Sequence, residues 1–210
     1  MLRRAARHRA FGYNPGVRRR IYIAGPDVFL PNWPAVAERK RDICEQFGFE
    51  AVFPADDPAT DERTAEAARR LSEANERLIE SCDALIANMT PFRGPSMDVG
   101  TAYEMGYMRA LGRPVLGYSN VADSLLERVV RVHGGEQVGD RWVDTDGSTI
   151  EDFGLAENLM LAGAVLASGA EVVRLAAAPD RGLADLTAFT LCVENARRVF
   201  ALAHLGASGL

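Results

Sequence analysis

Residues 84–118, ALIANMTPFRGPSMDVGTAYEMGYMRALGRPVLGY, carry the clearest fold signal in the chain. A short apolar run (84–88) is followed by a loop rich in proline and glycine (89–99), a segment with helical spacing (100–111) and a second apolar run (114–118). Two parallel strands need a crossover of about this length between them, and a helix is its usual form. The stretch therefore predicts one strand–helix–strand unit of a parallel sheet.

The same alternation of short apolar runs and helical segments extends to both sides of this unit. Further strands are expected at residues 20–24, 50–53 and 171–175. Further helices are expected at residues 33–47, 61–81, 122–132, 155–167 and 183–205. This order is typical of an α/β fold, and we predict an open parallel sheet, flavodoxin-like or Rossmann-like, in a three-layer α/β/α arrangement.

Glycine marks two helix ends and one insertion. Gly48 and Gly112 follow the first and third predicted helices, where a residue in the left-handed conformation would end each helix. Residues 133–148 contain several glycines around Trp142, which predicts a loop or a small hairpin inserted in the domain.

The composition excludes several classes of protein. The 210 residues are 48% hydrophobic and 25% charged, as in one soluble globular domain. A net charge of −5 argues against a nucleic-acid partner, and no apolar run approaches the roughly 20 residues that cross a membrane. Three cysteines lie far apart without a Cys-x-x-Cys pair, so we expect no zinc site and no disulfides, which fits a cytoplasmic location.

The charge is unevenly distributed, because the first twenty residues contain seven Arg and no Asp or Glu. This segment lacks the apolar centre of a secretory signal, although an organelle transit peptide can have such a composition. We expect residues 1–19 to form a basic, disordered tail and residues 20–210 to form one α/β domain.

A ligand is expected at the loops that follow the strands, because open α/β sheets bind ligands beyond the carboxyl ends of their strands. Gly25, after the first strand, would let the backbone approach a ligand closely. The loop at residues 89–99 leads through Asp98 into the helix that carries Glu104. Six residues correspond to about 240° around a helix, so Asp98 must belong to the loop or to the N-cap of that helix.

Two carboxylates at the start of one helix could flank a small ligand. This arrangement can cleave a glycosidic bond, since one group attacks or stabilises the anomeric carbon while the other serves the leaving group. The alternative is structural: Asp98 only caps the helix, and Glu104 is solvated or paired with Arg93 or Arg109. The two residues by themselves leave both interpretations open.

Three segments together resemble the nucleoside 2-deoxyribosyltransferase family: YIAGP (22–26), CDALIANMTPFRGPS (82–96) and DVGTAYEMG (98–106). A fourth segment, EDFGLAENLM (151–160), resembles the one that family members contribute to the site of a neighbouring subunit. The similarity covers residues 20–165.

The resemblance implies roles for four residues. Glu104 matches the nucleophile that attacks the anomeric carbon and holds the sugar as a glycosyl-enzyme ester. Asp98 matches the acidic residue beside the ligand and is expected to help protonate the departing base. Tyr22 is expected to orient the carboxylate of Glu104. Asn158 is expected to bind a sugar hydroxyl across a subunit boundary, which implies a homodimer or a higher homo-oligomer.

The resemblance also implies nucleosides and free nucleobases as substrates, with no metal and no organic cofactor. The chain departs from the family at Asn75, where members often have an acidic residue that contacts the base. More of the base protonation would then fall on Asp98. The residues expected to bind substrate are Gly25, Asp27, Asn75, Phe92, Ser96, Gly100, Asn158 and Met160.

Three other functions stay open. A hydrolase of nucleosides or nucleoside 5-monophosphates would use the same Glu104, and Ser96 with Arg93 could hold a phosphate. A phosphoribohydrolase with a Gly-Gly-x-Gly-Thr-x-x-Glu loop would share residues 100–104, but residues 97–99 replace its double glycine. A nucleoside-binding module without turnover would tolerate Glu104→Ala.

Overall fold

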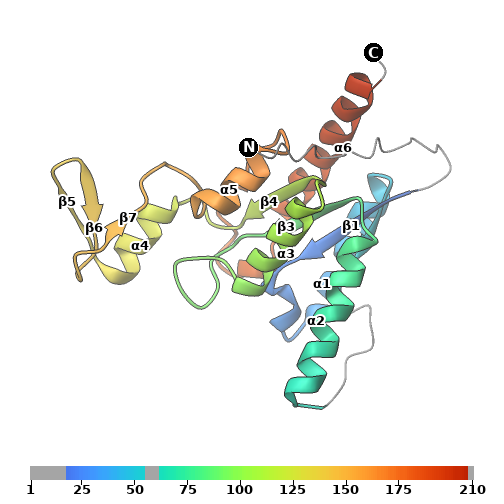
Figure 1. The fold of residues 1–210 in the computed structure, drawn as a ribbon, viewed down its shortest axis with the longest axis horizontal. Coiled ribbons are helices and arrows are strands. Elements are labelled where there is room, and N and C mark those ends of the chain that lie inside the picture. Colours follow the sequence, from blue (N-terminus) through green and yellow to red (C-terminus); the bar gives the residue numbers. More distant parts are fainter. Residues whose placement is uncertain (1–17, 55–61, 208–210) are drawn as a thin grey trace, which may run out of the picture.

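The computed structural model describes residues 18–54 and 62–207, so the predicted tail at residues 1–19 lies outside the described residues up to residue 17. Its centre is a parallel five-stranded sheet in the order β2-β1-β3-β4-β8 (Figure 1). The strands are β1 (Arg19–Ala24), β2 (Phe49–Val52), β3 (Ala84–Asn88), β4 (Val115–Ser119) and β8 (Val173–Arg174). This is the flavodoxin-like strand order, and it confirms the predicted fold class.

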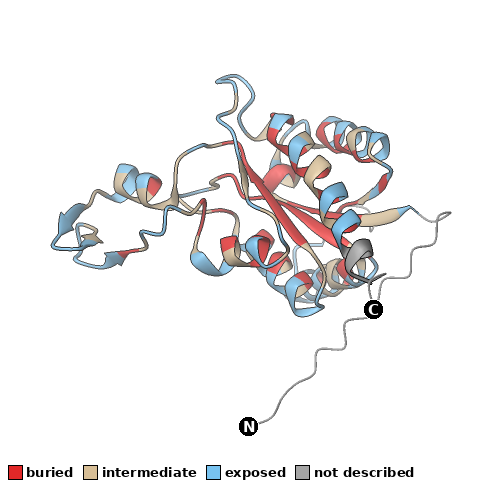
Figure 2. Ribbon diagram, turned by 90° about the horizontal axis from the view of Figure 1, so that it is seen from above, coloured by how far each residue is buried: buried red, intermediate tan, exposed pale blue. Residues whose placement is uncertain are grey.

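Side chains of the central strands alternate between two apolar layers. Ile21 and Ile23 of β1 belong to one layer, whereas Tyr22 and Ala24 belong to the other. Every residue of β3 and β4 is buried, because both faces of a parallel sheet are covered by helices. Figure 2 shows the buried strands between helices whose outer sides are exposed.

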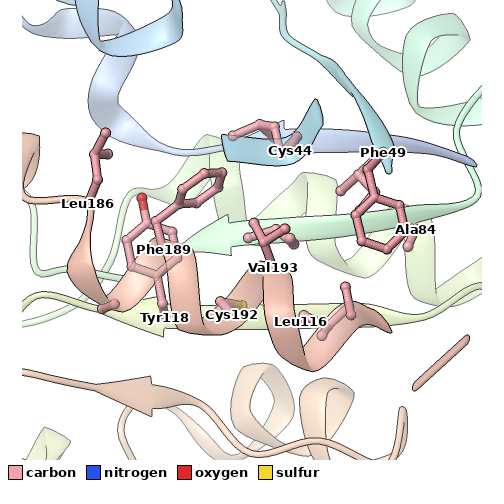
Figure 3. Packing of buried hydrophobic residues seen from close by; sticks show 14 of the residues in the cluster. Cys44, Phe49, Ala84, Leu116, Tyr118, Leu186, Phe189, Cys192 and Val193 are labelled. Atoms are coloured by element: carbon pink, nitrogen blue, oxygen red, sulfur yellow. The ribbon is translucent and has the colours of Figure 1, made fainter. Parts of the chain in front are cut away.

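Each face of the sheet has its own set of helices. Residues of α1 (Trp33–Gln46) and α6 (Thr187–Ala207) pack with Ile21 and Ile23. Figure 3 shows Phe189, Cys192 and Val193 of α6 packed beside β4. Residues of α2 (Ala65–Glu80), α3 (Val99–Ala110) and α5 (Leu159–Leu166) pack on the opposite face, with Tyr22.

The predicted helix ends are confirmed at two glycines. Gly48 has a φ of 83° and Gly112 a φ of 73°, the left-handed conformation that glycine adopts readily. The start of α2 differs from the prediction. The side chain of Thr64 accepts a hydrogen bond from the backbone N–H of Ala67, so this helix begins after Thr64 and not at residue 61.

The insertion, predicted as a loop or a small hairpin at residues 133–148, is a three-stranded antiparallel sheet whose third strand lies just beyond that range. It contains β5 (Glu136–Val138), β6 (Arg141–Val143) and β7 (Thr149–Ile150), and it follows α4 (Leu125–His133). In Figure 1 this small sheet and α4 extend away from the five-stranded sheet. Within the described ranges, no helix combines the length and apolarity needed to span a membrane.

Candidate active site

The hydroxyl of Tyr22 and the carboxylate of Glu104 meet between β1 and α3. Tyr22 is fully buried, and its hydroxyl donates a hydrogen bond of 2.7 Å to Oε1 of Glu104. Burial and the negative charge of Glu104 raise the pKa of Tyr22 well above its usual value, so the hydroxyl keeps its proton and remains a donor. The contact therefore fixes one oxygen of Glu104.

Glu104 is in an environment that disfavours its charge. Burial raises the pKa of Glu104 to about 7; the hydrogen bond from Tyr22 opposes this shift, and the negative charge of Asp98 adds to it. A carboxyl group with such a pKa is partly ionised near neutral pH, which is a property of groups that exchange protons or attack a substrate. No ion pair joins Glu104 to Arg93 or Arg109 in the part of the chain that the structure describes.

Asp98 is the N-cap of α3, one of the two positions, loop or N-cap, that the six-residue spacing allows. Its Oδ2 accepts hydrogen bonds from the backbone N–H of Thr101 at 2.9 Å and from the Thr101 hydroxyl at 3.1 Å. A Cβ on Gly100 would lie 3.1 Å from the same oxygen, so glycine leaves room for the carboxylate. Asp98 thus lies at the N-terminus of the helix, where the helix dipole favours negative charge, whereas Glu104 lies beyond the first turn of the same helix.

An aromatic pair stands beside these loops at the carboxyl edge of the sheet. The rings of Phe29 and Phe92 are stacked, with centroids 5.4 Å apart and an interplanar angle of 9°. The guanidinium of Arg93 lies over both rings, 5.1 Å from Phe29 and 4.6 Å from Phe92. Arg93 is therefore committed to the two rings and not to Glu104.

The loop after β1 is held by a buried ion pair. Nζ of Lys40 lies 2.9 Å from Oδ2 of Asp27, and Asn88 donates to both oxygens of the same carboxylate at 3.1 and 3.2 Å. Lys40 also donates a hydrogen bond of 2.9 Å to the hydroxyl of Tyr118. The carboxylate of Asp27 is thus engaged with internal partners, and direct contact with a substrate stays a prediction.

Gly25 is required by this arrangement. A Cβ at position 25 would lie 2.4 Å from Oδ2 of Asp27 and 2.7 Å from Cβ of Asn88, distances that side chains do not tolerate. Gly25 therefore allows the buried carboxylate to sit directly beneath the loop.

In the segment at residues 151–160, residues 151–158 form a turn between β7 and α5, and α5 (Leu159–Leu166) begins at Leu159. Asn158 caps this helix: its Oδ1 accepts from the backbone N–H of Met160 at 3.0 Å, and its amide donates to Glu151. The side chain of Met160 is 73% exposed. Glu157 is buried and accepts a hydrogen bond from the hydroxyl of Ser96. This bond links the loop that carries Ser96 to the turn before α5.

Asn75 lies half-buried on α2, next to the helix that carries Glu104. The following residue, Glu76, accepts a hydrogen bond from the hydroxyl of Tyr103 on α3. A base-contacting role for Asn75 stays a prediction. Among the described residues, no group of three or more His, Cys, Asp and Glu side chains is arranged to hold a metal ion.

Sequence reasoning missed Lys40, Arg128 and Glu157, three charged residues that are buried in the structure. Lys40 had a usable signal, because it lies at helical spacing from the apolar Val36 and Cys44 on the buried side of α1. Arg128 and Glu157 are 29 residues apart and pair only through the tertiary fold.

Comparisons with known proteins identify the family of the chain. The family model described as nucleoside 2-deoxyribosyltransferase matches residues 21–160. A 2-deoxyribosyltransferase structure from Leishmania mexicana is 36% identical, covers 68% of this chain and 85% of its own, and superposes with a TM-score of 0.54.

Two further comparisons concern relatives described without an activity. A protein of Schizosaccharomyces pombe, described as uncharacterized, is 32% identical over 165 residues, which are 71% of this chain and 78% of that protein. A conserved protein from Enterococcus faecalis shares the fold, with a TM-score of 0.51, 18% identity and coverage of 85% of this chain and 99% of its own. On the family match and the 36% identity to the Leishmania mexicana structure, the chain belongs to the nucleoside 2-deoxyribosyltransferase family.

Proposed function

We propose that the protein transfers a 2-deoxyribosyl group from one nucleobase to another through a covalent ester on Glu104. The observation that supports this most directly is the 2.7 Å hydrogen bond from the buried Tyr22 to Glu104. It orients a carboxylate whose surroundings hold its pKa near neutrality, beside a second carboxylate on the same helix. Membership of the family supports nucleosides as the substrates.

The first half of the reaction forms the ester. A carboxylate oxygen of Glu104 bonds to C1 of the sugar while the bond from C1 to the base nitrogen breaks. The electron pair of the broken bond goes to the base, which takes up a proton from Asp98; Asp98 must therefore enter this step protonated, while Glu104 is ionised. Tyr22 holds Oε1, which leaves Oε2 as the attacking atom.

The second half reverses these steps with another base. The nitrogen of the incoming base attacks C1, the ester bond breaks, and Glu104 regains its negative charge. The proton lost by the incoming base returns to Asp98. Two displacements at C1 retain the original configuration of the sugar. Transfer requires that water stays out, and the stacked Phe29 and Phe92 are candidates for an apolar wall.

An exchange assay tests this proposal. The protein is incubated with a deoxynucleoside and a different free base, and the products are separated by chromatography. We expect the swapped nucleoside. Free sugar and free base alone would assign the protein to the hydrolases, and no product at all would favour a nucleoside-binding module.

The covalent step has its own test. Intact-protein mass spectrometry after quenching should show a sugar adduct on the wild type and no adduct on Glu104→Ala. Digestion of the wild-type adduct should locate the sugar in the peptide that contains Glu104. Glu80→Gln is a matched control, because Glu80 also accepts a hydrogen bond of 2.7 Å from a tyrosine, Tyr107, but at the surface. Exchange activity that survives in Glu104→Ala would contradict the mechanism.

We also propose that a second copy of the chain completes each site with Asn158. Exposed apolar residues lie on the elements that would meet it, Val99 and Tyr103 on α3 and Met160 on α5. Mixing inactive Glu104→Ala and Asn158→Ala proteins, with unfolding and refolding to exchange subunits, should restore about a quarter of the wild-type activity in a dimer. A mixture that stays inactive, or an active monomer in light scattering, would contradict this arrangement.

A further inference from the structure

We propose that the buried ion pair of Arg128 and Glu157 is a positioning device that aligns the loop before Asp98 with the turn that carries Asn158. The expected effect of the pair on KM and kcat rests on the proposed function, whereas its expected effect on the order of the two segments does not. The side chains of Arg128 and Glu157 are 4% and 0% exposed, and Nη2 of Arg128 lies 3.1 Å from Oε2 of Glu157.

Glu157 joins two segments that are about 60 residues apart in the chain. Its Oε1 accepts from the hydroxyl of Ser96 and from the backbone N–H of Asn158, the latter at 3.0 Å. Its Oε2 accepts from the backbone N–H of Met97 at 3.0 Å. One carboxylate therefore binds the two residues before Asp98 and the backbone of Asn158.

Arg128 makes the same connection with backbone carbonyl groups. Its Nε donates to the carbonyl of Pro95 at 2.7 Å, and Nη2 donates to that of Ala156 at 2.8 Å. Nη1 donates to the carbonyl of Asp123, before α4, at 2.8 Å. A planar guanidinium can serve three carbonyls and a carboxylate at once, and a lysine ammonium cannot reproduce this fork.

The loop needs such support because its own backbone pairing is sparse. Between β3 and α3, a single backbone bond within the loop joins the N–H of Phe92 to the carbonyl of Ser96 at 3.0 Å. A buried ion pair contributes little net stability compared with apolar residues of similar size. We therefore expect the pair to act on geometry. It fixes the backbone that leads to Asp98, and because Asp98 caps α3 it also fixes the position of Glu104 on that helix.

Arg128→Lys tests the proposal with the charge preserved and the fork removed. Hydrogen exchange of the full-length protein should become faster in residues 91–98 and in residues 155–160 together. Arg131→Lys is the matched control, because Arg131 lies on the same helix and pairs with Asp123 at the exposed surface. Faster exchange in one segment alone, or in neither, would overturn the proposal without reference to any activity.

Kinetics separate positioning from loss of folded protein. In Arg128→Lys, we expect the KM for the deoxynucleoside to rise by about tenfold together with a lower kcat, since misplacement affects both binding and reaction. Unfolding of part of the sample lowers kcat but leaves KM unchanged, so an unchanged KM would assign the pair a merely structural role. Glu157→Gln, which keeps the shape of the side chain, should show the same pattern if Arg128→Lys does not fold.

The two proposals fail in different ways. If the wild type has neither transferase nor hydrolase activity while Arg128→Lys loosens both segments, the proposed function is wrong and the alignment role stands. If the wild type is active and Arg128→Lys has the same hydrogen-exchange rates and the same KM as the wild type, the alignment role is wrong and the proposed function stands.

Discussion

In the proposed mechanism, Glu104 must be ionised to attack a sugar, yet its surroundings raise its pKa to about 7. Because this value lies above the usual one, the folded protein binds the proton of Glu104 more tightly than the unfolded chain does. The contribution of this group to stability is therefore fully present at low pH and is lost as the pH rises through about 7. Ionisation of Glu104 therefore lowers the free energy of unfolding, although the proposed attack on the sugar requires it.

Glu104→Gln should accordingly stabilise the protein in a pH-dependent way. Removal of the buried charge is expected to raise the free energy of unfolding on the order of 1–3 kcal/mol at pH 8 and by much less at pH 5. Thermal melts of the variant and the wild type at both pH values measure this. Equal differences in Tm at the two values would contradict the raised pKa.

Tyr22→Phe should move the pH dependence of activity. The hydrogen bond from Tyr22 lowers the pKa of Glu104, so its removal raises that pKa further. The acidic limb of the profile of kcat/KM is then expected to shift to higher pH, with reduced activity at pH 7. Tyr107→Phe, which removes a similar surface hydrogen bond to Glu80, should leave the profile unchanged.

The proposed mechanism adds the role of proton donor to the cap that Asp98 forms in the structure, and two substitutions distinguish the two roles. Asn can still cap α3 but carries no charge, so Asp98→Asn should shift the acidic limb to lower pH and reduce kcat through loss of the proton donor. Asp98→Ala should show the same kinetic loss together with a destabilisation of about 1 kcal/mol from the missing cap. Denaturant titrations and pH profiles of both variants check this, and equal stability of the two would refute the capping role.

Residue types and spacing predicted only part of this site. The six-residue interval predicts that Asp98 lies in the loop or at the N-cap, and the structure has it at the N-cap. The contact between Tyr22 and Glu104 spans 82 positions, so no local pattern could predict it; the resemblance supplied that expectation. The buried pair of Arg128 and Glu157 carries no local signal at all, because each residue alone has the sequence context of an ordinary surface charge.

Among the elements, the loop between β1 and α1 depends on Lys40. Lys40 is fully buried against the rings of Tyr118 and Phe189 and paired with Asp27. A charge at this depth is stable only because the carboxylate, an amide and a hydroxyl surround it. The pair connects the short helix η1 (Pro26–Phe29), α1 and β4 at one end of the sheet.

Lys40→Met should destabilise the protein by about 3–5 kcal/mol, since Asp27 would keep a buried charge without its partner. The double variant Lys40→Met with Asp27→Asn should recover part of this loss. Urea denaturation of both proteins measures the difference. Arg198→Met, which breaks an exposed pair with Glu194, serves as the control and should change stability little.

Element boundaries were predictable where local chemistry acts alone. β3 was predicted at residues 84–88 and occupies Ala84–Asn88, because its apolar residues lie between Asp83 and the polar Asn88, which ends the strand. α5 was predicted from residue 155 but begins at Leu159, since Glu157 is bound by the distant side chains of Ser96 and Arg128 and Asn158 is the N-cap of the helix. Long-range hydrogen bonds therefore override the helical spacing of that segment.

At the scale of the whole molecule, the strand order follows from the alternation of strands and helices. Short crossovers and a common handedness leave few arrangements for such a chain, and the observed sheet is one of them. The sequence did not predict which face of the sheet carries the candidate active site and which carries the buried Lys40. The proposed chemistry involves the face covered by α2, α3 and α5, whereas the buried Lys40 lies in the opposite layer with α1 and α6.

The small antiparallel sheet offers a practical point of attachment. Its chain departs after α4 at His133, whose carbonyl accepts a bond from Thr145, and returns through the buried Ile150. The turn at Gly139 and Asp140, between β5 and β6, is exposed. A fluorescent label or an affinity handle grafted into that turn would report on the protein without cutting any strand of the main sheet.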